Sequence, residues 1–524
     1  AIAFGGMLLV ILYLMKRSAG EFVSVIPVLT VYALAGYRFI PALQNIYASV
    51  TQLRYAEPAI NEVYNDIKSL GSFNIEENKT ILQFNKNSAG ENTTTILKRH
   101  LYACKTCKGS GLIISEVPPS ANKNLYPNLA IIGGGIAGVA LAVACLHRSI
   151  PFTLYERDTN FEDRSQGYGL TLQQASKSIK GFGLFKLDQG VVSSRHVVHT
   201  TEGKVIGEWG MRKWMPTKEV SALKPSNIHI ARQSLRLELL NQLGGSNFVK
   251  WDHKLVAIQK DTTKGVKLRF KVNGNLRETS ADLVVGADGI RSTVRKLMPL
   301  KDNDSLHYLG CIVILGICPL KKLKDLESPL LDSATVFQTA NGKERIYMMP
   351  YAKDSVMWQL SFPLSETEAK ALSTKGLKEL KNEASRRTQW HNPVPQILKA
   401  TSEANISGYP VYDREILKPE AMQSLGEVSL IGDAAHPMSP FKGQGANQAL
   451  LDALALARGI SRGCQPSSKW REVGIRKSVL TEFEAEMIQR TTPKVNDSAA
   501  AAKFLHSKQI LKVQNKPRGS LFKI

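Results

Sequence analysis

The stretch Asn-Leu-Ala-Ile-Ile-Gly-Gly-Gly-Ile-Ala-Gly, residues 128–138, decides the fold. Apolar residues lead into glycines at the spacing of the dinucleotide-binding fingerprint, and an apolar helix follows over residues 139–145. Gly133 permits a tight turn, Gly135 lets the backbone approach a pyrophosphate, and Gly138 lets the helix pack closely on the strand. The start of the helix offers free N–H groups and a positive dipole end to phosphate. We therefore predict a strand–turn–helix unit that binds a dinucleotide.

A second strand is predicted at residues 152–155, and it ends at Glu156. This acid stands about twenty residues beyond the glycines, where the fingerprint places a carboxylate for ribose hydroxyls. An ordinary acidic residue at a strand end is the alternative interpretation of Glu156. The strand before, the helix after and the acid together favour the dinucleotide site over a chance glycine-rich turn.

Length and charge limit the class of protein. The 524 residues correspond to roughly two to four domains, and the net charge of +23 favours anionic partners such as a nucleotide cofactor or acidic lipid. We predict no nucleic-acid partner, because the chain has no RNA-binding signature or zinc-finger spacing. The six cysteines are too few and too scattered for a disulfide scaffold. Cys104 and Cys107 give only two thiolates, whereas a structural zinc site typically has four ligands, so no metal site is predicted.

Residues 1–70 look different from the rest of the chain. Residues 1–15 and 22–37 are charge-free, but each run is slightly shorter than the roughly 20 residues of a membrane span. Residues 36–67 resemble the end of the transmembrane domain of an ABC-type exporter, yet the chain contains no G-x-x-x-x-G-K-[ST] motif, so it cannot drive ATP-coupled transport alone. For residues 1–40 the sequence allows either buried helices or contact with a membrane. An artificial fusion of the exporter-like part to the nucleotide-binding part of the chain is a further alternative. The protein is expected to be membrane-associated if this segment is genuine and cytoplasmic otherwise.

Two further motifs follow the glycine turn in a fixed order. They are Gly-Ala-Asp-Gly at residues 286–289 and Gly-Asp-Ala-Ala-His-Pro at residues 432–437. With the glycine turn they resemble the FAD-dependent aromatic hydroxylases, the p-hydroxybenzoate hydroxylase-like and salicylate hydroxylase-like monooxygenases. The resemblance covers about 330 residues, and the triplet is specific to that family.

The resemblance implies a set of cofactor-binding residues. It places the ADP part of FAD at the glycine turn and the isoalloxazine above the second glycine-rich turn, at residues 442–447. It also places the flavin phosphate and ribityl chain at Arg232 and Asp433, and the nicotinamide near Arg164. No catalytic acid or base is implied. The alternatives are a helix cap for Asp288 and solvated helix charges for Arg232 and Arg236. The implied residues are Gly133, Gly135, Gly138, Glu156, Arg157, Arg164, Arg232, Asp288, Asp433, Pro437, Gly443 and Gly445.

The resemblance also implies the reaction. NAD(P)H would reduce FAD, the reduced flavin would form a C4a-hydroperoxide with O₂, and this would hydroxylate a small aromatic substrate. The rivals are a flavin oxidoreductase of the same fold without oxygen insertion, a membrane-transport remnant, and a plain NAD-binding module. Tyr347, Met349 and Trp358 are candidate pocket residues and equally good core residues.

The expected fold is α/β. It consists of a Rossmann-like FAD-binding fold interleaved with a β-sheet substrate domain, plus N-terminal apolar helices and a C-terminal helical segment. We predict an apolar, membrane-like segment at residues 1–70, a polar linker at 71–125, and the monooxygenase at 126–460, with its substrate domain mainly at 305–410. A C-terminal helical segment and basic tail complete the chain at 461–524.

Overall fold

The computed structural model describes residues 100–104, 111–163, 167–210, 227–261, 265–298, 305–424 and 426–517. They all belong to one compact unit, residues 96–524. The predictions of apolar helices, membrane contact and exporter likeness for residues 1–70 lie outside the described residues. Among the helices of the described ranges, none is both long enough and apolar enough to cross a membrane.

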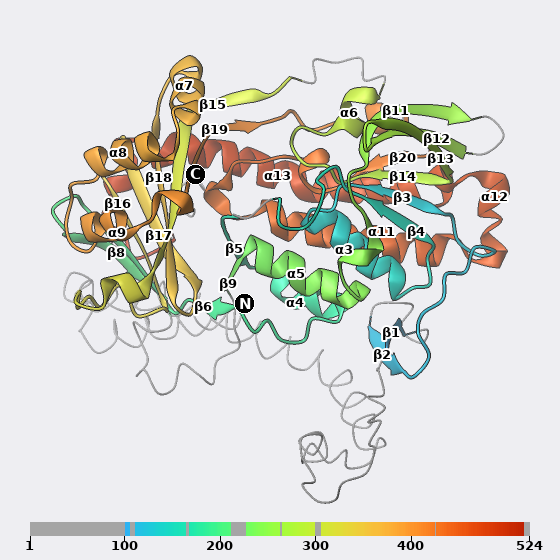
Figure 1. The fold of residues 1–524 in the computed structure, drawn as a ribbon, viewed down its shortest axis with the longest axis horizontal. Helices are drawn as coiled ribbons and strands as arrows, with labels where there is room; N and C mark the ends of the chain where they lie inside the picture. Colours follow the sequence, from blue (N-terminus) through green and yellow to red (C-terminus); the bar gives the residue numbers. More distant parts are fainter. Residues whose placement is uncertain are drawn as a thin grey trace, which may run out of the picture. The chain divides into compact units, whose positions relative to one another are not determined.

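A five-stranded parallel sheet forms the first half of the fold (Figure 1). Its central strands are buried throughout, which explains their continuous apolar sequence, because a parallel sheet is covered on both faces. The strand predicted before the glycines is present as β3. In spatial order the strands are β10 (Val249–Lys250), β4 (Phe152–Tyr155), β3 (Leu129–Ile132), β14 (Leu283–Gly286) and β20 (Val428–Leu430).

Three helices pack together beside this sheet, and a small antiparallel sheet lies across from them (Figure 1). The helices are α3 (Ile136–Leu146), α5 (Arg232–Leu243) and α11 (Gly445–Gly463), and each buries apolar residues in the same core. The ring of Phe270 stacks on Tyr155 at 4.5 Å and joins the small sheet to that core. This small sheet consists of β11 (Lys254–Asp261), β12 (Gly265–Val272) and β13 (Asn275–Ala281).

A seven-stranded mixed sheet forms the second half. Alternate residues of its strands pack under helices α7 (Glu366–Thr374), α8 (Leu377–Arg387) and α9 (Val394–Ala400). The substrate domain was expected mainly at 305–410; five strands of this sheet lie at residues 307–413, and the other two come from residues 195–209. In spatial order the strands are β19 (Ile406–Asp413), β15 (His307–Pro319), β18 (Ser355–Pro363), β17 (Arg345–Ala352), β16 (Thr335–Ala340), β7 (Arg195–His199) and β8 (Val205–Trp209).

A third, short sheet connects the two halves. Strand β9 pairs on either side with β5 and β6, and it runs directly into helix α5. Its bounds are β5 (Gly169–Leu172), β9 (Ile228–Ala231) and β6 (Val191–Val192). Short helices fill the remaining connections: α4 (Ala175–Ser178), α6 (Thr293–Leu297), α10 (Pro419–Gln423) and α12 (Trp470–Val473).

The structure departs from the predicted linker at residues 71–125. A hairpin of β1 (His100–Ala103) and β2 (Leu112–Ser115) forms there, and the Ala103 N–H donates to the His147 carbonyl at 2.7 Å. Its strands are too short for a periodic pattern to be visible in the sequence.

The C-terminal segment is helical, as expected, and its main element is α13 (Thr481–Leu505). Beyond it, the Gln514 N–H donates to the Ile206 carbonyl at 2.9 Å, so the start of the basic tail is attached to the edge of β8.

Candidate active site

The glycine turn between β3 and α3 has the geometry that its spacing predicts. Gly133 has φ +112°, and a Cβ there would lie 2.5 Å from the Ala287 oxygen. A Cβ on Gly138 would lie 1.9 Å from the Gly133 oxygen, so the helix and the turn touch through their backbones. Gly135 is different, because its Cβ would meet only the Arg232 guanidinium at 3.7 Å. Helix α3 begins there without a side-chain cap, which leaves its N–H groups facing open space.

Glu156, at the end of β4, is bound to this turn. Its carboxylate accepts hydrogen bonds from the backbone N–H groups of Gly134 at 2.6 Å, Arg157 at 2.8 Å and Asp158 at 3.1 Å. A small cavity lies beside the glycine turn, and the Arg157 side chain, which is 58% exposed, lies at its rim. Glu156 therefore shapes the turn in addition to any contact with a ribose.

Arg236 was open to interpretation as a solvated helix charge, and the structure excludes this. It is 2% exposed, its Nε donates to the Gly134 carbonyl at 2.7 Å, and its guanidinium lies 4.8 Å from the Phe161 ring centre. Sequence reasoning missed its role, because the helical spacing of Arg236 is equally typical of a surface position. Arg236 holds the glycine turn from the side opposite Glu156.

Asp288 caps a helix, which was the simpler of its two interpretations. Its carboxylate accepts from the Ser292 hydroxyl at 2.5 Å and from the N–H groups of Thr293 at 2.6 Å and Val294 at 3.1 Å at the start of α6. It also lines the cavity beside the glycine turn. Burial raises its pKa, although these hydrogen bonds oppose the shift. Asp288 thus fixes the Asp-Gly turn, and the backbone of that turn borders the nucleotide cavity.

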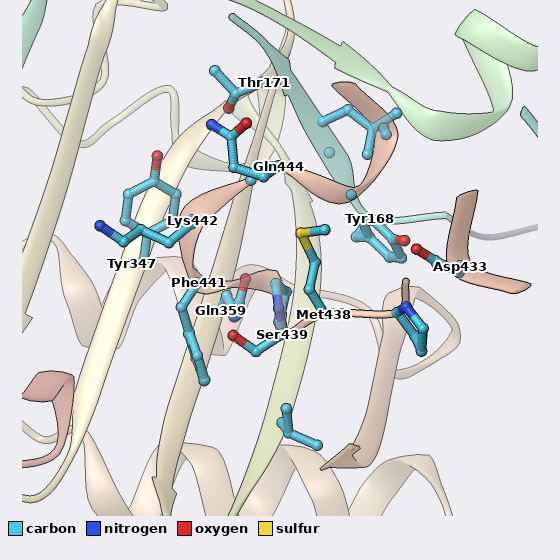
Figure 2. Close-up of a pocket in the computed structure, with 18 of the residues that line it drawn as sticks. Tyr168, Thr171, Tyr347, Gln359, Asp433, Met438, Ser439, Phe441, Lys442 and Gln444 are labelled. Carbon is cyan, nitrogen blue, oxygen red and sulfur yellow. The ribbon is translucent and has the colours of Figure 1, made fainter. Parts of the chain in front are cut away.

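A larger cavity of about 470 Å³ lies between the two halves of the fold (Figure 2). One wall is the loop from Asp433 to the first turn of α11, which contributes Pro437, Gly443 and Gly445. Helix α11 begins without a side-chain cap, and Gly443 adopts φ +59°, so the backbone of this wall is bare where a flat ring would lie. The positive end of the α11 dipole faces the same space.

Arg232 connects the small cavity to the large one. It lines the glycine-turn cavity, and its guanidinium carbon lies 5.9 Å from the ring centre of Tyr168, which lines the large cavity. Burial raises the pKa of Asp433, and its interactions with His436 and Arg232 partly oppose that shift. Arg164, the expected nicotinamide contact, lies outside the described residues.

A buried ionic network supports the Asp433 loop from behind. Asp452 of α11 is fully buried, and its Oδ2 accepts from the Gly432 N–H at 2.8 Å and lies 2.7 Å from His436 Nε2. Its Oδ1 accepts from Arg490 of α13 at 2.9 Å. Both ends of the Gly-Asp-Ala-Ala-His turn are therefore fixed to α11 through one carboxylate. His436 therefore has a structural role in this turn.

The opposite wall of the large cavity is one face of the seven-stranded sheet. Tyr347 and Met349 line it, as the sequence suggested, but Trp358 does not, because its neighbours in β18 face the cavity instead. Trp358 lies in the core under the helices and donates to the Thr401 hydroxyl at 2.9 Å. Sequence reasoning missed the other polar lining residues of this wall and of the adjoining strands: His196, His229, Arg345, Gln359 and Tyr409. For Arg345 a signal existed, namely a charge at the start of a strand that is otherwise almost entirely apolar.

The two cavities together fit FAD. The small one offers an uncapped helix start and open space at Gly135 for a pyrophosphate. Arg232 stands where the two cavities approach each other, and Asp433 stands on the side of the large one. The large one offers a second uncapped helix start beneath a glycine-rich wall. No residue of the described turns closes the space at Gly135.

Comparison with known families and proteins agrees with this geometry. A family described as FAD binding domain matches residues 127–465. The chain is 27% identical over 359 residues to the aurachin C monooxygenase/isomerase of Stigmatella aurantiaca, covering 68% of this chain and 86% of that protein. It is 29% identical over 335 residues to the 3-amino-4-hydroxybenzoate 2-monooxygenase PtmB3 of Streptomyces platensis, covering 64% and 79%.

Solved structures share the fold. Klebsiella pneumoniae HpxO, complexed with FAD and uric acid, superposes with a TM-score of 0.59 at 20% identity, covering 73% of this chain and 90% of that one. Pseudomonas aeruginosa PqsL, described as a probable FAD-dependent monooxygenase, gives a TM-score of 0.56 at 21% identity, covering 74% and 98%. At these identities the likeness concerns the fold alone.

Proposed function

The chain belongs to the family of FAD-dependent monooxygenases that share this FAD binding domain, and we propose that it hydroxylates a small aromatic substrate held in the 470 Å³ cavity. It is an FAD enzyme that uses NAD(P)H and O₂. The relatives named above include one that acts on 3-amino-4-hydroxybenzoate, which is a substrate of this size. The carrying observation is the large cavity itself, which lies between a bare glycine-rich wall and a sheet wall.

Each wall has a separate task in this proposal. When bound, FAD supplies the electron transfer from NAD(P)H and the activation of O₂. The uncapped start of α3 and Arg232 bind the phosphates, Asp433 binds the ribityl chain, and the wall from Pro437 to Gly445 lies along the flavin ring. Glu156 binds the ribose, and Arg157 lies at the rim of that site. We keep the domain limits expected from the sequence as a proposal, except that the hairpin at residues 100–115 joins the enzyme and residues 195–209 join the substrate domain.

The sheet wall orients the substrate and excludes water. Met349, Met357 and Val411 make part of this wall apolar, so a substrate ring displaces little ordered solvent. His196 and His229 border the same space, and burial lowers their pKa to about 4 and about 3. Both imidazoles are therefore neutral near pH 7, and neither gives a proton to the reaction there.

The function is tested with purified holoenzyme under ¹⁸O₂. We expect the protein to be yellow from flavin, to oxidise NAD(P)H faster in the presence of an aromatic substrate, and to yield a product that is heavier by one ¹⁸O atom. Consumption of NAD(P)H with hydrogen peroxide as the sole product from every aromatic compound tested would instead support the rival flavin oxidoreductase without oxygen insertion.

A further inference from the structure

A chain of three glutamine side chains connects helix α13 to the glycine-rich wall of the large cavity. It starts at Arg490, whose Nη1 donates to the Gln448 side-chain oxygen at 2.6 Å. Gln448 Nε2 donates to the side-chain oxygen of Gln444 at 3.3 Å, and Gln444 Nε2 donates to that of Gln173 at 2.7 Å. Gln173 Nε2 ends the chain at the Lys442 carbonyl, at 3.4 Å. A side chain of α13 is thus linked to the wall that is proposed to lie along the flavin ring.

The direction of this chain is fixed at its start. A guanidinium has only donors, so the oxygen of the Gln448 amide must face Arg490 and its NH₂ group must point away. Each following amide then accepts from the one behind and donates to the one ahead, so the positive ends all point toward the cavity. Gln448 is fully buried and Gln444 is 9% exposed, which shields these bonds from water. Aligned hydrogen bonds in such surroundings polarise and strengthen one another.

Arg490 is charged, and all three of its nitrogens donate. Nε donates to Glu486 at 2.9 Å, and Nη2 donates to Asp452 at 2.9 Å. Burial alone would lower the pKa of Arg490, but Asp452 and Glu486 raise it above its ordinary value. Because these carboxylates balance the positive charge, Gln448 passes on a fixed orientation of dipoles rather than a net charge.

The far end of the chain lies at the second glycine-rich turn, whose Lys442, Gly443 and Gln444 line the large cavity (Figure 2). Asn447, which is fully buried, supports the same turn, because its Nδ2 donates to the Gly443 carbonyl at 2.8 Å. Side-chain donors thus engage two backbone oxygens of the turn, at Lys442 and Gly443. This adds to the positive potential at the uncapped start of α11.

We propose that Arg490 is a positioning residue that acts through the three glutamines to favour the reduced state of the bound flavin. Hydride transfer from NAD(P)H adds two electrons and one proton to FAD, and so leaves one extra negative charge on its ring system. Dipoles that are already oriented toward that charge stabilise it without reorganisation. The inference rests on the proposed function, because it uses the flavin position proposed there.

The test measures the two-electron reduction potential of FAD in the purified holoenzyme, and the Kd for oxidised FAD, in the wild type and in Gln448→Met. Methionine keeps the length of the side chain and removes both ends of the amide. We expect reduced FAD to lose about 3- to 10-fold more affinity than oxidised FAD, the size of one net hydrogen bond, which lowers the potential by ~15–30 mV. A merely structural role would weaken both redox forms equally and leave the potential unchanged.

Variants of Arg490 show whether it acts through the same chain. Arg490→Met should also lower the potential, and the double variant with Gln448→Met should not exceed the larger single shift, because both changes interrupt one chain. Arg490→Lys should keep part of the wild-type potential, since it retains the charge without the fork, and it replaces Arg490→Met if that variant does not retain FAD. If Gln448→Met does not retain FAD, Gln448→Glu decides, because an ionised carboxylate accepts from Arg490 but cannot donate to Gln444.

Arg476→Met is the matched control. Arg476 is another largely buried arginine of the C-terminal segment, and it pairs with Glu484 at 2.7 Å. Its other donors go to the backbone carbonyls of Gly426 and Val428, away from the glutamines. This variant should lose stability and keep the wild-type reduction potential.

The inference is overturned if Gln448→Met keeps the wild-type potential, if Arg476→Met shifts the potential equally, or if the effects at Arg490 and Gln448 add. These measurements use no aromatic substrate, so they are separable from the fate of the proposed function. An ¹⁸O-labelled product, with an unchanged potential in Gln448→Met, would overturn the inference and leave the monooxygenase intact. Peroxide as the sole product, with the lowered potential in Gln448→Met, would contradict the function and support the role of Arg490.

Discussion

At the scale of single residues, two glycines of one turn have separable tasks. An added methyl at Gly138 would lie 1.9 Å from the Gly133 oxygen, whereas one at Gly135 would make only an ordinary contact with Arg232. Gly135 also has φ −74°, which any residue adopts. Folding therefore depends on one glycine, and access of the phosphates depends on the other.

We expect Gly135→Ala to fold like the wild type and to bind FAD at least about tenfold more weakly, which corresponds to ~1.4 kcal/mol. Gly138→Ala should lower the free energy of unfolding of the apo-protein by about 1–3 kcal/mol or more through overpacking. Thermal unfolding of both apo-proteins, followed by FAD titration, makes the comparison. Wild-type FAD affinity in Gly135→Ala would show that the pyrophosphate lies elsewhere.

Asp433 is proposed to bind FAD, but its buried carboxylate lowers the stability of the apo-protein. Because burial raises its pKa, the ionised carboxylate weakens folding at pH values above the ordinary range of about 4. Asp433→Asn should therefore make the apo-protein at least as stable as the wild type at pH 7, with the difference vanishing as the pH falls below about 4. The same variant should lose FAD on purification. A less stable apo-protein at pH 7 with full flavin content would contradict both assignments.

At the scale of elements, helix α13 stabilises the loop that carries Asp433. Arg490 donates to Asp452 of α11, and the Ser439 hydroxyl donates to the Ser498 carbonyl at 2.7 Å. Burial alone would raise the pKa of Asp452, but His436 and Arg490 lower it below its ordinary value. The C-terminal segment, which lies largely beyond the family match at residues 127–465, is thus part of the site's support.

Arg490→Met should lower the free energy of unfolding by about 3–5 kcal/mol, because it removes one partner of a buried ion pair. Stability from a depressed carboxylate pKa is present above the unfolded value and is lost as the pH falls through the folded value. Because the pKa of Asp452 is lowered less in Arg490→Met, this variant should unfold at a higher pH than the wild type in an acid titration. Arg386→Met is the control: its exposed pair with Glu383 should contribute at most about 1 kcal/mol. Equal acid midpoints in Arg490→Met and wild type would contradict the network.

The elements that could be predicted from sequence are those with a local pattern. The strand at residues 129–132 and the helix after the glycines follow directly from apolar runs and glycine spacing. The start of helix α11 at Gly445 could not be located from the sequence, because glycine and polar residues make up most of its first turn. Strands β7 and β8 could not be assigned to the large sheet, since only tertiary contacts place them there. For the same reason the sequence did not reveal the buried roles of Arg345, Asp452 and Arg490. A charged side chain is expected to be exposed to solvent unless its tertiary partners are known.

At the scale of the whole molecule, all residues proposed for the flavin site lie beyond residue 127. The hairpin β1–β2 nevertheless packs on this unit, as a Cβ on Gly183 would lie 2.5 Å from the Leu101 side chain. The division of the chain at residues 95 and 96 agrees with an enzyme that includes the hairpin.

A chain that begins at Ile96 should therefore keep the flavin content and the NAD(P)H turnover per flavin of the full chain. A chain that begins at Ala121 should also bind FAD, but it should be less stable by about 1–3 kcal/mol, because it loses the burial of Leu101. Flavin content and thermal unfolding of the three proteins measure this. A protein from Ile96 that is folded but flavin-free would show that residues 1–95 belong to the enzyme.

The parallel pairing of β7 with β16 has a consequence for folding during synthesis on the ribosome. Arg195 lies beside Thr335, about 140 positions later in the chain. At ~5–20 residues per second, a ribosome needs roughly 7–28 s to supply the partner strand, and Asp433 emerges later still. During that interval β7 has only β8 as a partner strand, so the large sheet and the flavin site beside it are completed only near the end of synthesis.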